Sequence, residues 1–502
     1  MLMARIGSSN CRYQPSNEAY FQKYRENTIG YHQTFESPYG LKKLIYADWA
    51  ASGRLYGPIE SKIVHELGPF VANTHTESNL TGTLMTQAYE KAKQIIKNHV
   101  HANEHDIILF AGSGMTGAVN KLQRLLGLKI HEKLKPLYPI AEKDRPVIFV
   151  THMEHHSNHI SWAETIADVV CLPPGPGGMV DPAHLERLLL QFQHRPIKIG
   201  AFTACSNVTG FEVPIHQLSR KMHEHGGVCF VDFSASAPYA EIDMHPTDPL
   251  EKLDGIVFSP HKFLGGPGTS GVLIMDSRLC LHCAPDQPGG GTVSWTNPWG
   301  GYEYKDSIEA REDGGTPPFL QAVRTALCIQ LKEQMGYSRM LERKKELTSL
   351  LLKGLGTIPG LHILGGSSQD RLGIVSFVVG HIHYNLIVKL LNDRFGIQVR
   401  GGCSCAGPYG HYLLGIDQQA SKQMTDLIHE GDLSRKPGWV RLSLHPMMTN
   451  QEVSYIVSSI RAIVENIITW QKDYTYQPES NEWRSMNEHH KIDISKWFNF
   501  SN

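Results

Sequence analysis

The chain has 502 residues, of which 41% are hydrophobic, and its 48 Lys and Arg residues nearly balance 49 Asp and Glu residues. A chain of this length exceeds a single hydrophobic core, so we expect two or three domains. Balanced charge gives no overall field that favours nucleic acid or an anionic membrane, so a small molecule is the expected partner. No run approaches the roughly 18 apolar residues of a membrane span, and no signal peptide is evident, so a cytoplasmic location is expected.

Nine cysteines are scattered along the chain, mostly inside apolar runs. Their odd number and scatter indicate free thiols in a reducing compartment. Cys280 and Cys283 form one close pair, and Cys403 and Cys405, in QVRGGCSCAGPYGHY, form another. A zinc site usually needs two C-x-x-C pairs. Cys280 and Cys283 have this spacing but lack a second such pair, and Cys403 and Cys405 are only two positions apart, so no metal is expected.

Short apolar runs alternate with helical patterns between about residues 45 and 330. The runs read IILFAGSG, VIFVTHME, IGAFTACSN, VCFVDFSAS, GIVFSPHK and GVLIM. Stretches such as GAVNKLQRLLGL and HQLSRKMHEHG between them have helical periodicity. Buried strands that alternate with helices predict a large α/β domain with a largely parallel, doubly wound sheet.

A second pattern begins at about residue 331. A long helical stretch leads to the strand GIVSFVVG, the helix YNLIVKLLNDRFG and the strand WVRLSLH. This order predicts a smaller α+β domain over residues 331–470. Residues 1–44 and 471–502 are polar, contain scattered aromatic residues and show no clear period, so we expect arms that pack on the body or on a partner subunit.

Two turns after predicted strands carry polar side chains. In ILFAGSGMTGAVNKL, Thr116 lies where a strand becomes a helix, and N–H groups and a hydroxyl there can bind an anion. In THMEHHSNHISW, His155 and His159 have the i, i+4 spacing of a metal pair, but no acidic or cysteine ligand set is nearby. We therefore interpret one of the histidines as a ring stacked on a cofactor.

Lys262 follows an apolar strand and precedes a glycine-rich run. A loop lysine is usually solvated. Here Ser259 and His261 stand beside it as donors, and the glycines allow the backbone to approach a ligand closely. This combination suits a lysine that holds pyridoxal phosphate as a Schiff base. Asp232, at the end of the upstream strand, would pair with the pyridine nitrogen, although alone it is equally a helix N-cap.

Together these motifs resemble the class V aminotransferase fold of pyridoxal-phosphate enzymes, and within it the group II cysteine desulfurases and selenocysteine lyases. MEHHSNHISW and SPHK match the family's M-E-H-H-x-N-x-x-x-W and S-x-H-K, while YADWAASG, SNVTG, AREDGGTPP and VRGGCSCAGP match more loosely. The resemblance extends from about Tyr46 to about Arg461. It implies fold type I, a mostly parallel seven-stranded sheet over residues 45–330, a smaller α+β C-terminal domain, and pyridoxal 5′-phosphate as the cofactor.

The resemblance also implies roles for the matching residues. Lys262 would carry the cofactor, Asp232 would pair with its pyridine nitrogen, and His155 would stack on its ring. Arg441 would bind the carboxylate of an amino-acid substrate, a bidentate task that suits arginine. The remaining cofactor contacts would come from Thr116, Asn207, Ser259, His261 and Thr316. Thr316 matches a threonine that reaches the phosphate from the neighbouring subunit, so a homodimer is implied.

Three features depart from the family pattern. Ala235 stands where the family has a glutamine that supports the ring hydroxyl of the cofactor. The candidates to replace that glutamine are Ser234, Ser236 and Asn207. Residues 131–146 and 417–438 are expected to be insertions, and the second lies where it could reshape the mouth of the site.

The R-x-G-x-x-C-A match aligns Cys405, rather than Cys403, with the family nucleophile. It implies a cysteine desulfurase, in which Cys405 takes sulfur or selenium from cysteine or selenocysteine, leaves alanine, and passes the sulfur to a protein or thiol acceptor. Flanking glycines would let this loop move. Two alternatives stay open. One is an aminotransferase, lyase or epimerase that acts on another amino acid, in which Cys405 has no catalytic role. The other is a degenerate relative that only binds a partner, but the presence of Lys262, Asp232 and Arg441 argues against it.

Overall fold

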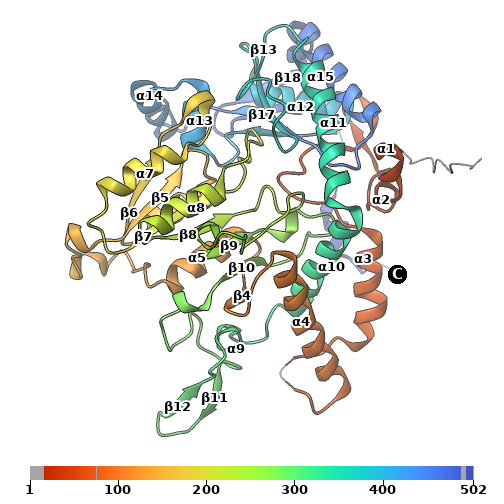
Figure 1. The fold of residues 1–502 in the computed structure, drawn as a ribbon. Coiled ribbons are helices and arrows are strands. Elements are labelled where there is room, and N and C mark those ends of the chain that lie inside the picture. Colours follow the sequence, from red (N-terminus) through yellow and green to blue (C-terminus); the bar gives the residue numbers. More distant parts are fainter. Residues whose placement is uncertain (1–15, 75, 488–492, 501–502) are drawn as a thin grey trace, which may run out of the picture.

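The large sheet has seven strands in the order β4-β10-β9-β8-β7-β5-β6. This computed structural model describes residues 16–74, 76–487 and 493–500, and Figure 1 shows its elements. The pairs β9–β8, β8–β7, β7–β5 and β5–β6 are parallel, which confirms the mostly parallel sheet. The strands are β4 (Asp106–Ala111), β5 (Val147–Thr151), β6 (Asp168–Leu172), β7 (Lys198–Thr203), β8 (Val228–Asp232), β9 (Gly255–Phe258) and β10 (Gly271–Asp276).

The strand β10 runs antiparallel to both of its neighbours, β4 and β9. A parallel connection needs a crossover, usually an α-helix. The segment between β9 and β10 contains only a 3-10 turn, Pro260–Lys262, so the chain reverses direction instead. Lys262 therefore lies in the connection between two antiparallel strands at the edge where β8 and β9 end.

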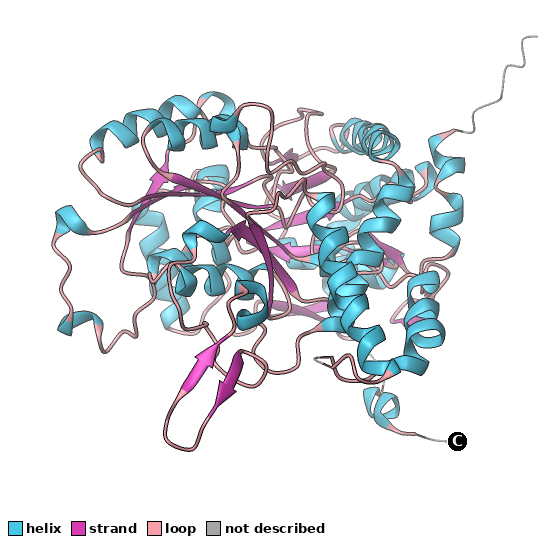
Figure 2. Cartoon of the chain, turned by 60° about the horizontal axis from the view of Figure 1, so that its bottom comes forward, coloured by secondary structure: helices cyan, strands magenta, loops and turns pink. Residues whose placement is uncertain are grey.

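Side chains of the central strands alternate between two cores. In β5, Val147 and Phe149 belong to one core and Ile148 and Val150 to the other, as expected from the period of two along a strand. Helices cover both faces of the sheet (Figures 1 and 2). The longer helices of this part are α4 (Leu80–His99), α5 (Met115–Leu125), α7 (Pro182–Gln191), α8 (Ile215–Glu224) and α10 (Phe319–Met335); the shorter ones are α3 (Gly57–Ser61), α6 (Ile160–Ala163) and α9 (Ile308–Glu312).

The C-terminal part is built on a four-stranded antiparallel sheet in the order β13-β14-β17-β16. Its strands are β13 (Leu361–Ile363), β14 (Ile374–Val379), β16 (Arg400–Gly402) and β17 (Trp439–Ser443), and its helices are α11 (Tyr337–Leu355), α12 (Tyr384–Phe395), α13 (Gly407–Leu414), α14 (Gln418–His429) and α15 (Asn450–Trp470). The long helical pattern is divided between α10 and α11 at Gly336, whose φ of 78° favours glycine.

The N-terminal elements and the C-terminal hairpin pack on the body, whereas residues 493–500 are exposed. Before the large sheet lie α1 (Asn17–Tyr20), α2 (Gln22–Glu26), the hairpin β1 (Thr34–Ser37)–β2 (Gly40–Lys43), and β3 (Ile45–Tyr46), which pairs in parallel with β15 (Ile397–Gln398). The C-terminal hairpin β18 (Tyr474–Gln477)–β19 (Glu482–Ser485) contacts α12, where Tyr474 donates a hydrogen bond to Asp393 at 3.1 Å. Residues 1–15 of the predicted N-terminal arm, and residues 488–492 and 501–502 of the predicted C-terminal arm, lie outside the described residues.

A hairpin of β11 (Val293–Thr296) and β12 (Tyr302–Tyr304) protrudes from the body (Figure 2). Trp295, Trp299 and Tyr302 on it are exposed. Of the two predicted insertions, 131–146 contains only short 3-10 turns, whereas 417–438 contains α14. None of the helices in the described ranges combines the length and apolar character needed to cross a membrane.

Candidate active site

One pocket collects side chains from the carboxyl ends of several strands. The parallel strands β5, β7 and β8 end at the same edge of the sheet, and the connection after β9 adds Lys262. The residues that line the pocket are Met115, Thr116, His155, Ser157, Thr203, Cys205, Asn207, Asp232, Ser234, Ala235 and Lys262. Five of the predicted site residues therefore lie together: Thr116, His155, Asn207, Asp232 and Lys262.

Lys262 and Asp232 give this pocket its charge. Burial lowers the pKa of Lys262 to about 8, even though the nearby carboxylate of Asp232 acts to raise it. Burial raises the pKa of Asp232, whose Oδ1 accepts a hydrogen bond from the backbone N–H of Ser234 at 2.8 Å. An amine with a pKa near neutrality has a neutral, nucleophilic fraction that an exposed lysine lacks. The pair therefore suits covalent chemistry at the Lys262 amine.

The N-terminus of α5 lies beside this charged pair. Ser259 Oγ accepts the backbone N–H of Met115 at 2.8 Å. A Cβ at Gly114 would lie 3.1 Å from Ser259 Oγ and 3.5 Å from the ring of His261, so these side chains pack closely against the turn. Thr116 follows in the first turn of the helix. Helix N–H groups, hydroxyls and an imidazole thus form a place for a phosphate group.

His155 presents a neutral ring to the pocket. Burial lowers the pKa of His155 to about 4, and the charge of Lys262 adds to this effect. The ring is held in place because its Nδ1 accepts the backbone N–H of Ser157 at 3.1 Å. The hydroxyl of Ser157 lies 2.7 Å from the hydroxyl of Thr116. This arrangement connects the ring to the N-terminus of α5.

Arg441 on β17 is buried beside the pocket and bonded to two groups. Its Nη2 donates to Asp48 Oδ1 at 2.8 Å and its Nη1 donates to the carbonyl of Asn207 at 3.2 Å. Arg441 Nε is buried and has no partner among the described residues. Asp48 also accepts from Arg400 Nε at 3.1 Å. Two guanidinium groups share one carboxylate, so the cluster keeps a net positive charge that favours an anionic ligand.

Cys405 lies on a tight turn beside these residues. The N–H of Ala406 donates to the carbonyl of Cys403 at 3.0 Å, and Ser404 and Cys405 between them have φ values of 51° and 55°. Cys405 is exposed, whereas Cys403 is half-buried. Asn207 Nδ2 donates to the carbonyl of Ser404 at 2.7 Å. The segment that we expected to move is therefore tied to the pocket by hydrogen bonds in this structure.

Two further predictions concern residues at the edge of the pocket. Thr316 lines a neighbouring pocket together with Thr116, and its hydroxyl donates to Asn73 Oδ1 at 3.3 Å. Of the candidates to replace the missing glutamine, Ser234 and Asn207 line the pocket of Lys262 beside Ala235. Ser236 is not among the lining residues, and its hydroxyl donates instead to the carbonyl of Phe233 at 3.4 Å.

Sequence reasoning missed several residues that the fold brings to the site. Asp48 lies in YADWAASG, which the sequence linked only to the family resemblance. His156 lies in the histidine-rich motif and forms two hydrogen bonds with the cysteine turn. Cys205 lines the pocket and is buried. Position after the predicted strand VIFV was a signal for His156, but the partners of Asp48 and His156 are distant in the sequence.

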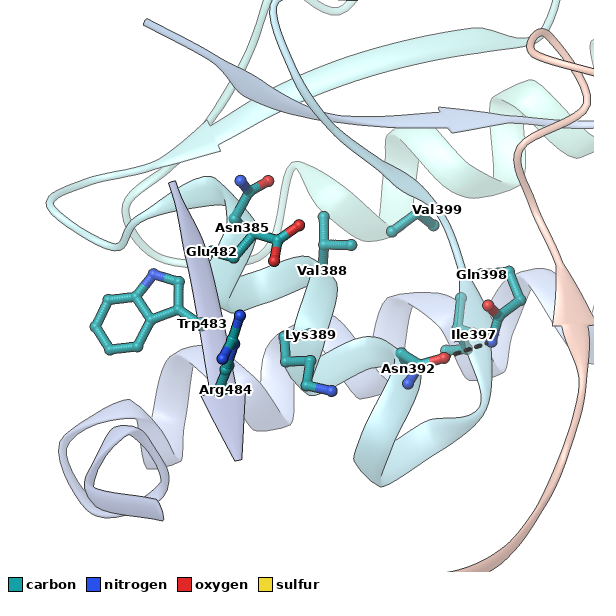
Figure 3. A pocket seen from close by; sticks show the side chains of 10 residues that line it. All are labelled: Asn385, Val388, Lys389, Asn392, Ile397, Gln398, Val399, Glu482, Trp483 and Arg484. Atoms are coloured by element: carbon teal, nitrogen blue, oxygen red, sulfur yellow. Dashed lines mark hydrogen bonds between the residues drawn. The ribbon is translucent and has the colours of Figure 1, made fainter. Parts of the chain in front are cut away.

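A separate groove lies between α12, β15 and β19. Figure 3 shows the side chains that line it, and Gln398 Nε2 donates to Asn392 Oδ1 at 2.9 Å within it. Its lining residues are Asn385, Val388, Lys389, Asn392, Ile397, Gln398, Val399, Glu482, Trp483 and Arg484. None of them is a predicted site residue, so we assign the groove no part in the chemistry.

Comparison with known proteins supports a single family. Residues 45–456 match the family model described as aminotransferase class V. A probable cysteine desulfurase of Halalkalibacterium halodurans is 28% identical over 376 residues, which cover 74% of this chain and 86% of that protein. One of Streptomyces coelicolor is 26% identical over 371 residues, which cover 73% of this chain and 84% of that protein.

Solved structures agree in fold. The apo structure of a cysteine desulfurase from Thermococcus onnurineus NA1 has a TM-score of 0.70 at 22% identity, covering 88% of this chain and 98% of that chain. A cysteine desulfurase from Escherichia coli has a TM-score of 0.68 at 21% identity, covering 90% of this chain and 99% of that chain. These likenesses confirm the predicted fold class. Because the family model spans most of its length, this chain belongs to the class V aminotransferase family.

Proposed function

We propose that this chain is a pyridoxal phosphate-dependent cysteine desulfurase that acts on L-cysteine or L-selenocysteine. The observation that carries this proposal is the place of Cys405, an exposed thiol on a turn that Asn207 ties to the pocket of Lys262 and Asp232. Relatives named probable cysteine desulfurase, which align with about three-quarters of the chain, support the same activity.

The pocket fits pyridoxal phosphate, the cofactor of this family. Lys262 would bind it covalently, Asp232 would pair with its pyridine nitrogen, and His155 would lie on its ring. The N-terminus of α5, with Thr116, would take its phosphate. Asn207 Oδ1 is buried without a partner among the described residues, which leaves one acceptor for a bound group. When bound, the cofactor supplies an electron sink for a substrate carbanion.

The remaining residues would act on the substrate. The unpartnered Nε of Arg441 is a donor for the substrate carboxylate. The thiolate of Cys405 would attack the substrate sulfur: the bond between sulfur and Cβ breaks, a persulfide bond forms, and the carbon takes up a proton to leave as alanine. The persulfide then requires an acceptor protein or a thiol. Because Cys405 is exposed, such an acceptor can reach it.

The proposed assembly is a homodimer. The hairpin β11–β12 carries exposed aromatic side chains, and apolar surface of this kind favours contact with another chain. Thr316 lies in the connection between α9 and α10, and the pocket that Thr316 lines is shared with Thr116. A second copy of the chain at this surface would complete the phosphate site.

The proposal is tested by incubating the purified protein, loaded with pyridoxal phosphate, with L-cysteine, L-selenocysteine and a panel of other amino acids. We expect sulfide and alanine from cysteine, and a reductant-sensitive mass increase of one sulfur on the peptide that contains Cys405. Cys405→Ser should abolish sulfide release, because a serine hydroxyl cannot accept sulfane sulfur, and Cys403→Ser is the matched control. Release of a keto acid from another amino acid, without sulfide from cysteine, would identify an aminotransferase instead.

A further inference from the structure

We propose that His156 is a positioning residue that fixes the Cys405 turn against the cofactor pocket. The proposal rests on the proposed function only in taking Cys405 as the nucleophile. The backbone N–H of His156 donates to the carbonyl of Cys405 at 2.7 Å, and His156 Nε2 accepts the backbone N–H of Gly407 at 2.8 Å. One histidine therefore holds the chain on both sides of Ala406.

The turn needs such support because its backbone is strained. Ser404 and Cys405 both have left-handed φ values, and they are adjacent. The other non-glycine residues with positive φ in the described part of the chain, His101 and Asn481, are isolated. A left-handed conformation is unfavourable for any residue with a Cβ, because the Cβ comes too close to a backbone carbonyl oxygen. The turn would therefore relax unless surrounding bonds held it, as is common at functional sites.

The ring of His156 is suited to this task by its chemistry. A backbone N–H can only donate, so Nε2 must carry a lone pair and the ring must be neutral, with its proton on Nδ1. Burial lowers the pKa of His156, with a smaller contribution from His159, which favours the neutral ring. Glycine at the donor leaves room for this approach, because a Cβ at Gly407 would lie 3.1 Å from His156 Nε2 and crowd the ring.

The same segment also orients the pocket. His155, whose ring lines the pocket, directly precedes His156, and Ser157 bonds to both His155 Nδ1 and the hydroxyl of Thr116. A shift of His156 would therefore separate the thiol from the residues around the cofactor. We infer that His156 sets the distance over which sulfur is transferred, and that it acts through the turn without touching the substrate.

Hydrogen exchange tests the positioning without relying on activity. In the full-length, cofactor-loaded protein, we compare peptides covering residues 400–408 in the wild type, His156→Leu and His156→Gln. Leucine cannot accept the Gly407 N–H, so exchange should be about tenfold faster, the factor for the loss of about 1.4 kcal/mol. Glutamine offers an acceptor oxygen and should restore protection. His159→Leu is the matched control, because the ring of His159 forms no hydrogen bond with the described residues.

Steady-state kinetics then connects the turn to the reaction. His156→Leu should lower kcat for sulfide release from L-cysteine by about tenfold to a hundredfold, while the cysteine concentration that half-saturates the cofactor spectrum stays unchanged. Gly407→Ala should reproduce this loss with His156 intact. Wild-type exchange in His156→Leu would overturn the proposal, as would equal loss of protection in His159→Leu. If the wild type released no sulfide, the proposed function would fail, and the exchange result would still decide the positioning.

Discussion

Replacement of Asp48 by asparagine should destabilise the protein, because Asp48 is the carboxylate that Arg400 and Arg441 share. Arg400 and Arg441 lie directly opposite each other on β16 and β17, and like charges in this position repel. The carboxylate of Asp48 bonds both, at 3.1 Å and 2.8 Å. Only Arg441 is buried, with 3% of its side chain exposed against 52% for Arg400. The ion pair of Asp48 with Arg441 should therefore contribute much more to the free energy of unfolding than its pair with Arg400.

The magnitude follows from this difference in burial. Removing one partner of a buried ion pair costs roughly 3–5 kcal/mol, because the other charge is left without compensation, whereas an exposed pair contributes about 0–1 kcal/mol. An amide oxygen keeps one acceptor, so we expect Asp48→Asn to lower the free energy of unfolding by about 3 kcal/mol. Arg400→Gln, the matched control, should change it by less than about 1 kcal/mol.

The assay is urea unfolding of the cofactor-loaded variants at equal protein concentration, followed by fluorescence and circular dichroism. The double variant Asp48→Asn/Arg400→Gln should be less unstable than the sum of the single changes, because it removes the repulsion between the arginines. Equal and small effects of Asp48→Asn and Arg400→Gln would refute the reasoning. It would then follow that Arg441 does not depend on Asp48 for its compensation.

Three more predictions concern the site. Because its pKa is lowered to about 8 from 10.5, Lys262 in the cofactor-free protein should react with an amine reagent with a midpoint near pH 8. Between pH 8 and pH 10.5, Lys262 is mostly neutral in the folded protein but protonated in the unfolded chain. The free energy of unfolding should therefore rise with pH in that range, and Lys262→Met should remove the rise. Arg441→Lys should weaken the use of every accepted amino acid by roughly 1.5–3 kcal/mol in kcat/KM, with the cofactor spectrum unchanged. Light scattering should give twice the chain mass of 56.2 kDa, and Thr316→Ala should weaken cofactor binding; a monomer with wild-type cofactor affinity would contradict the role of Thr316.

The sequence was informative where local pattern decides structure. Apolar runs that end in small or polar residues became the buried strands of the large sheet, so residues directly after them met at one edge. Asp232 and Lys262 could be predicted as a pair for this reason. The strand DVVCL, which forms β6, was missed; it is only partly buried, unlike the strands that were predicted. The reversed direction of β10 followed from a connection without a helix.

Contacts between distant segments could not be predicted in the same way. Asp48 and Arg441 are 393 residues apart, and their ion pair depends on how the segment after β3 is aligned with β17. Gly407 and His156 are 251 residues apart. The periodicity and spacing within each segment do not reveal these contacts. Each of these polar side chains could equally form its hydrogen bonds with water.

The cysteine turn also shows how an insertion can lie close to the site without lining it. The helix α13 begins at Gly407, whose N–H is bonded to His156. At the other end of α13, His411 Nε2 lies 2.8 Å from the hydroxyl of Ser421 on α14, within the predicted insertion 417–438. None of the residues of α14 is buried, so the core does not fix this helix. The position of α14 relative to the cysteine turn therefore depends on its surface contact with α13. The strained backbone at Cys405 is held by its hydrogen bonds to His156 and Asn207, and not by α14.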